Sequence, residues 1–177
     1  MRVLVSVASK HGASSAIGAV IGEVIMGAGL EVDVLSPEQV ASVAPYEAVV
    51  LGSGIYAGRW LEPVKALIDR ELSLLRARRV WLFSSGPIGT PAKPEGEPPD
   101  GAAMRESTGA VDHRVFPGLL ERSRLGFAER TLMTVMKAPE GDYRPWDDIR
   151  AWAKAIAETL QPARRELGQS PIASVVG

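Results

Sequence analysis

The chain begins with an apolar segment, residues 3–8, that runs directly into a short turn of small and hydroxyl-bearing residues. The turn consists of Ser9, Lys10, His11, Gly12, Ala13 and Ser14, and apolar residues at helical spacing follow it. Backbone N–H groups at the start of a helix have no partner within the helix, so a strand, a turn and a helix in this order can hold a phosphate. The hydroxyl groups of Ser9 and Ser14 add donors. The pattern predicts a phosphate-binding loop, and the alternative is that serine and glycine only cap the helix.

This turn lacks the two commonest nucleotide-binding motifs. Gly12 stands alone where the dinucleotide motif has three glycines, and no Gly-Lys-Ser/Thr triplet follows it. A dinucleotide or a triphosphate is therefore disfavoured. A single terminal phosphate, such as that of flavin mononucleotide (FMN), fits better, because doubly wound sheets bind FMN at their switch point.

Hydrophobic periodicity along the chain predicts an open parallel α/β sheet with a short second crossover. Apolar or alternating runs predict strands at residues 3–8, 30–35, 48–53, 79–84 and 112–116. Helical spacing predicts helices at residues 17–28, 61–75, 102–107, 119–138 and 146–160. Between the fourth strand and the third helix, residues 86–101 carry five prolines and four glycines, which predicts a long functional or mobile loop.

Two further turns are expected to meet the first, because ligands gather at the carboxyl ends of the strands in such a sheet. The turn after the third strand carries an aromatic ring between glycines, and its candidate cofactor-binding residues are Ser53, Gly54, Ile55, Tyr56, Ala57 and Gly58. The turn after the fourth strand is built of small residues, and its candidates are Ser84, Ser85, Gly86, Pro87 and Gly89. Tyr56 is expected to lie against a flat ring, and the alternative for Tyr56 and Trp60 is core packing.

Composition limits the number of domains and the kinds of partner, metal site and cellular location that we expect. The 177 residues, 46% of them hydrophobic, suit one domain at residues 1–160 with a loose tail at 161–177. With 20 basic and 21 acidic residues, no nucleic-acid partner is expected. The chain has no cysteine and only two histidines, His11 and His113, which argues against a metal site. No secretory signal or spanning segment is apparent, so we expect a cytoplasmic protein with at most peripheral membrane contact.

The three turns together resemble those of the flavodoxin family. Residues 9–14 are similar to its phosphate loop, with His11 in place of the usual hydroxyl residue, and residues 52–58 and 84–89 are similar to its two isoalloxazine loops. The segments ASKHG (8–12), GSGIYAGRWL (52–61), WLFSSGP (81–87) and DYRPWD (142–147) resemble the flavodoxin-like, menaquinone-dependent protoporphyrinogen oxidases.

This resemblance implies a flavodoxin-like, open, doubly wound sheet of five parallel strands in the order 2-1-3-4-5, with an extra helical insert near the fifth strand. It also implies FMN as the cofactor, a porphyrinogen of haem biosynthesis as the electron donor and a quinone as the acceptor. No side chain is expected to act as catalytic acid or base, because the flavin carries the redox chemistry.

The predicted helix at 119–138 is the insert. It carries Arg122, Arg124, Arg130 and Lys137 against Glu121 and Glu129, so it is interpreted as a platform facing an anionic substrate or lipid headgroups. The alternative is a helix that covers the sheet. Two other functions stay open: an electron carrier between redox proteins, and an interaction module without flavin.

Overall fold

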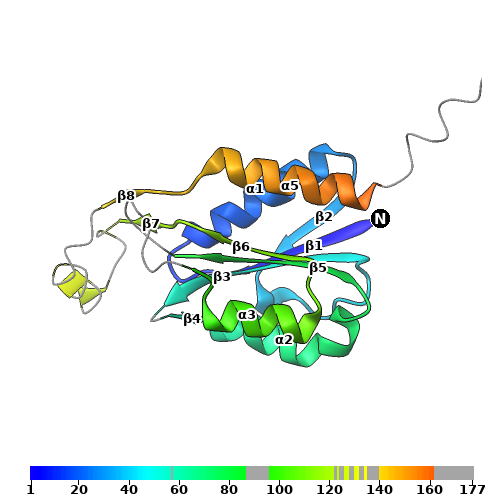
Figure 1. Cartoon of the computed structure of the whole chain (residues 1–177), viewed down its shortest axis with the longest axis horizontal. Helices are drawn as coiled ribbons and strands as arrows, with labels where there is room; N and C mark the ends of the chain where they lie inside the picture. Colours follow the sequence, from blue (N-terminus) through cyan, green and yellow to red (C-terminus); the bar gives the residue numbers. More distant parts are fainter. Residues whose placement is uncertain are drawn as a thin grey trace, which may run out of the picture.

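A parallel sheet between two pairs of helices forms the body of the computed structural model (Figure 1). The structure describes residues 1–56, 58–86, 96–121, 123, 126, 127, 130, 131, 134 and 140–161. The parallel strands are β1 (Arg2–Ala8), β2 (Glu31–Leu35), β3 (Ala48–Tyr56), β5 (Arg79–Ser85) and β6 (Asp112–Phe116). Their order is β2-β1-β3-β5-β6, so the predicted order 2-1-3-4-5 is confirmed.

One face of the sheet is covered by α1 (Ala13–Gly27) and α5 (Trp146–Leu160), and the other by α2 (Glu62–Leu75) and α3 (Pro99–Thr108), as Figure 1 shows. Side chains alternate along each strand, so β1 sends Val3, Val5 and Val7 into one core and Leu4 and Ala8 into the other. Burial on both faces explains why the central strands β1, β3 and β5 are rich in consecutive apolar residues.

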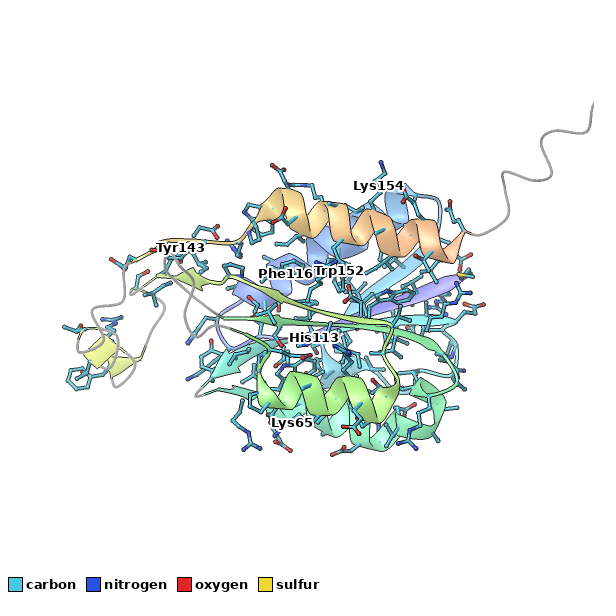
Figure 2. All side chains as sticks on the ribbon, viewed as in Figure 1. Lys65, His113, Phe116, Tyr143, Trp152 and Lys154 are labelled. Carbon is cyan, nitrogen blue, oxygen red and sulfur yellow. The ribbon has the colours of Figure 1, made fainter. Side chains whose placement is uncertain are left out.

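Aromatic rings fill the core beneath α5. Phe83, Phe116 and Trp152 meet with ring centroids 5.7–6.3 Å apart, and Figure 2 places Phe116 and Trp152 between the sheet and α5. On the same face of the sheet α1 approaches β1 closely, because a methyl group added at Gly18 would lie 2.5 Å from a Val7 methyl. Glycine in α1 therefore sets the distance between this helix and β1.

The second crossover is short, as expected: a 3₁₀ turn, η1 (Pro37–Gln39), replaces a helix between β2 and β3. Glu71 of α2, 8% exposed, fixes this connection by accepting hydrogen bonds from the Val43 N–H at 3.0 Å and the Ser42 hydroxyl at 2.9 Å. Arg70 reaches the Val40 carbonyl at 2.7 Å. Side chains of α2 thus hold a segment that has no helix of its own.

Three predicted elements need correction. Strand β3 continues to Tyr56, so it includes Gly54 and Ile55, which were expected in a loop. The predicted loop at 86–101 ends early, because α3 begins at Pro99. Leu119–Leu120 form a strand, β7, which pairs with β8 (Gly141–Asp142), so the predicted helix at 119–138 is wrong at its first two residues.

Other predictions fall partly outside the described residues. Within the insert, Phe127, Arg130, Thr131 and Thr134 are helical. Arg122, Arg124 and Lys137 lie outside the described residues, as do residues 87–95 of the long loop and the predicted tail from 162 onward. Among the helices that the structure describes, none has the length and apolar character needed to cross a membrane.

Candidate cofactor-binding site

The carboxyl ends of β1, β3 and β5 bring the three predicted turns together. A methyl group built on Gly54, at the end of β3, would lie 3.0 Å from the Ser14 hydroxyl and 3.3 Å from the Tyr56 ring. A methyl group on Gly86, after β5, would lie 3.0 Å from the Ile55 side chain. The expected convergence is therefore present, and glycine permits the close approach.

The first of these turns leaves the start of α1 without a side-chain cap. Gly12 occupies the N-cap position with a left-handed φ of 84°, its carbonyl accepts from the Ala16 N–H at 3.0 Å, and it has no side chain to offer the helix. The first turn of α1 carries no acidic residue. Ser14 is buried, Ser9 and Ala13 are half-buried, and Lys10 and Gly12 are exposed. N–H groups without a partner inside the helix or a side-chain cap, beside a hydroxyl and with no acidic residue in the first turn, suit the binding of a phosphate.

Tyr56 connects this cradle to the second turn. The Lys10 ammonium lies 5.2 Å from the centroid of the Tyr56 ring, and the His11 ring meets Tyr56 edge-on at 6.0 Å. Tyr56 is half-buried, whereas Trp60 is 2% exposed. Core packing, left open by the sequence for both aromatics, therefore applies to Trp60.

The second turn is the tip of a hairpin formed by β3 and β4 (Arg59–Trp60). Gly58 turns the chain with a φ of 77°, and Ala57 lies outside the described residues. Asp100 of α3 accepts from the Trp60 N–H at 2.9 Å and from the Arg59 side chain at 3.2 Å. Sequence reasoning missed Asp100, although an acidic residue in the first turn of a helix is a visible signal.

Two predicted serines use their hydroxyl groups within the protein. Ser53 donates to the Gly54 carbonyl at 2.8 Å and accepts from the Leu61 N–H at 2.9 Å. Ser84 is fully buried and accepts from the Trp60 indole at 2.8 Å. Both hydroxyls therefore stabilise the base of the β3–β4 hairpin through bonds within the protein. Ser85 is buried and Gly86 half-buried at the same edge, while Pro87 and Gly89 lie outside the described residues.

A family model described as a flavodoxin domain matches residues 4–145. The chain belongs to the flavodoxin domain family. No protein of curated function matches the sequence.

Solved flavodoxin structures share this fold. A flavodoxin from the domain Archaea superposes with a TM-score of 0.62 at 19% identity, covering 91% of this chain and 99% of that one. The two-electron reduced flavodoxin of Megasphaera elsdenii superposes with a TM-score of 0.59 at 20% identity, covering 88% of this chain and 98% of that one. The Flv1 flavodiiron core of Synechocystis gives 0.62 at 16% identity, covering 91% of this chain and 36% of that one. Neither the family model nor these structures link the chain to protoporphyrinogen oxidases.

One further side chain of this flavodoxin domain touches the phosphate cradle. Arg144 donates to the Ala13 carbonyl in the first turn of α1 at 3.3 Å and lies over the Trp146 ring at 4.5 Å. It also binds both oxygens of Asp142, at 2.8 and 2.6 Å, and its hydrogen bonds hold the pKa of that carboxyl below the usual value. The segment 142–147 stood out in the sequence, but its contact with residue 13 was not predicted.

Proposed function

We propose that this flavodoxin domain binds FMN and works as a redox protein. The observation that carries the proposal is the meeting of the uncapped start of α1 with the β3–β4 hairpin and Gly86 at one edge of the sheet. Residues 9–14 would hold the phosphate, and Gly54–Gly58 with Ser85 and Gly86 would flank the ring. FMN, when bound, supplies the electron chemistry, and the side chains position it and exclude water.

The fit rests on donor chemistry. FMN brings a doubly charged phosphate, and the cradle offers a helix N-terminus, the Ser14 hydroxyl and the nearby ammonium of Lys10. The ring-side turns offer close backbone approach at Gly54 and Gly86 together with the half-buried Tyr56. Within the described residues, no group of three or more acidic or histidine side chains could hold a metal ion.

We further propose that the protein is an oxidoreductase that takes electrons from a small organic substrate and delivers them to a quinone. The supporting observation is the segment between β6 and α5, whose β7–β8 ribbon lies at the side toward which the parallel strands run (Figure 1). In that segment Phe127 is 90% exposed and Arg130 is exposed, so the segment offers apolar and cationic groups that could contact a substrate. A porphyrinogen substrate rests on the sequence resemblance alone.

An electron carrier is the second candidate, because this chain covers 99% and 98% of two flavodoxins. A carrier is expected to show a strongly acidic face to its partners, which the near-zero net charge of this chain does not favour.

The first experiment incubates purified protein with FMN, removes free flavin by desalting, and records the absorbance spectrum and the mass of the released cofactor. Retention of about one flavin per chain supports the proposal, and protein that elutes without flavin contradicts it. Loaded protein is then mixed anaerobically with protoporphyrinogen and a quinone. Repeated oxidation of protoporphyrinogen with reduction of the quinone supports the oxidoreductase. If the bound FMN is reduced only when a redox protein is supplied as the electron donor, the result supports the carrier.

A further inference from the structure

A chain of hydrogen bonds runs from the buried Trp60 indole to the partly exposed Glu97, beside the ring-side half of the proposed site. The Trp60 indole donates to the Ser84 hydroxyl at 2.8 Å, Ser84 lies 2.8 Å from His113 Nε2, and His113 Nδ1 lies 2.5 Å from a Glu97 oxygen. The His113 side chain is 0% exposed, between the sheet and α3 (Figure 2). Gly101 of α3 packs directly on its ring. This histidine has no part in the function proposed above.

The two ends of this hydrogen-bond chain restrict the direction of its bonds. An indole N–H can only donate and a carboxylate can only accept. Trp60 therefore donates to Ser84, and His113 Nδ1 carries the hydrogen that Glu97 accepts. In a neutral His113 ring Nε2 is then bare and accepts the Ser84 hydrogen. A guanidinium nitrogen of Arg105 lies 3.9 Å from the same Glu97 oxygen.

A hydrogen on His113 Nε2 would break this arrangement. Ser84 would then accept from both Trp60 and His113, and its own hydrogen would lose the bond to Nε2 at a fully buried position. Loss of a buried hydrogen bond is destabilising. The geometry thus favours the Nδ1–H tautomer of a neutral His113 ring.

The hydrogen bonds from Trp60 to Glu97 join three segments that border the ring side of the site. Trp60 closes the β3–β4 hairpin, Ser84 stands two residues before Gly86, and Glu97 belongs to the connection from β5 to α3. We infer that His113, in its Nδ1–H form, is a positioning residue that holds these segments for the flavin ring. This inference rests on the proposed binding of FMN, and it assigns His113 no contact with the flavin.

The phosphate cradle is an internal control for the flavin-binding measurements, because none of the four hydrogen-bonded residues belongs to residues 9–14. Disruption at His113 should weaken FMN and riboflavin equally, since riboflavin has the same ring but no phosphate. Disruption at the cradle should weaken FMN selectively. The ratio of the two dissociation constants therefore separates a ring-side defect from a phosphate-side defect.

Two substitutions at His113 separate its two bonds. In His113→Asn the amide takes the place of Nδ1 and keeps the bond to Glu97, whereas in His113→Gln it takes the place of Nε2 and keeps the bond to Ser84. We expect the Gln variant and Glu97→Ala to raise both flavin dissociation constants about tenfold, because each cuts the same charge-assisted bond. Their double variant should be no weaker than either single one. The Asn variant keeps the bond to Glu97 but loses the bond to Ser84, so its dissociation constants should lie between those of the parent and the Gln variant.

Nitrogen NMR of the parent protein gives an independent reading. The expected spectrum shows a protonated Nδ1 and a bare Nε2 for His113. Glu106→Ala, at an exposed glutamate of α3, is the matched control and should bind both flavins as the parent does. Glu97→Ala alters a carboxylate that is 35% exposed, so it keeps the test available if a His113 variant fails to fold.

Four results would overturn the role of His113: a hydrogen on Nε2, parental affinity in Glu97→Ala, additive effects in the double variant, or a changed ratio of FMN to riboflavin affinity. If the parent protein binds neither flavin, the proposed function and this role are refuted together. If the parent binds flavin and the variants match it, only the role of His113 is refuted.

Discussion

The two edges of the parallel sheet are built on opposite plans. At the amino ends of the strands, Arg78 donates to the carbonyl oxygens of Ala44, Tyr46 and Leu74 at 2.7–3.0 Å. Arg2 reaches Asp33 at 2.7 Å beside them. At the carboxyl ends, the helix start is uncapped and glycines separate the turns. Side chains tie the loops together at the amino edge, and the carboxyl edge has the donors that the proposed phosphate needs.

This contrast suggests a division of labour. Substitutions at the amino edge should change the free energy of unfolding and leave flavin binding intact, whereas those at the carboxyl edge should do the reverse. Binding sites commonly sacrifice local stability in this way.

The largest effect is expected from Ser14→Glu. A carboxylate beside the start of α1 would repel the phosphate, so the FMN dissociation constant should rise about 100-fold or more. Fluorescence titration with FMN measures this change, with Ser73→Glu on the exposed surface of α2 as the control. Unchanged affinity in a folded Ser14→Glu protein would contradict the phosphate cradle.

Glu71→Ala tests whether a residue away from the carboxyl ends of the strands affects stability without affecting flavin binding. Loss of this buried carboxylate leaves the Val43 N–H and the Ser42 hydroxyl without their acceptor, and the free energy of unfolding should fall by about 2–3 kcal/mol. Urea titration measures the change, and Glu158→Ala, at an exposed position of α5, should stay within about 0.5 kcal/mol. Flavin affinity should not change at 25 °C, and a loss of more than threefold would break the division between the edges.

Arg144→Ala should have an intermediate effect, because this side chain tethers the first turn of α1. The FMN dissociation constant should rise about fivefold, while Arg150→Ala on exposed α5 leaves it unchanged.

The contribution of the Arg144–Asp142 pair to the free energy of unfolding should depend on pH. Hydrogen bonds from Arg144 lower the pKa of Asp142 below its ordinary value of 3.8, so the stability that this pair adds is present at neutral pH and is lost as the pH falls through the lowered pKa. In Arg144→Ala this part of the acid dependence should disappear from urea titrations between pH 5 and about pH 2. An unchanged profile would show that Asp142 titrates alike in the folded and unfolded chains.

The smallest effect on affinity is expected from Tyr56→Ala, about threefold. If the Tyr56 ring lies against the flavin, the absorbance bands and the reduction potential of bound FMN should shift, and Tyr56→Phe should retain the parental bands. A spectrum of Tyr56→Ala that superimposes on the parent would assign Tyr56 to packing.

Much of the fold could be predicted, because burial leaves a strong local signal: consecutive apolar residues in the central strands and an apolar stripe at helical spacing in α5. Residues 112–116 and 146–160 appear with the predicted bounds. The two-residue strand β7 left no such signal, since it exists only through pairing with residues about 20 positions later.

The site was predicted less completely, for two physical reasons. The face toward which a serine points depends on the register of its strand, so the internal bonds of Ser53 and Ser84 were missed. The contacts of Asp100 with Trp60 and of Arg144 with Ala13 span 40 and 131 positions, and local periodicity carries no information at those separations.

The anchorage of the β3–β4 hairpin has a consequence for protein engineering. Ser53, Ser84 and Asp100 hold the base of the hairpin, and none of them belongs to its tip at residues 57 and 58. The tip can therefore be exchanged as a cassette, with lengthened or recharged turns grafted onto an unaltered frame. A library built at these two positions would vary the surroundings of the proposed flavin site while the rest of the sheet folds as before.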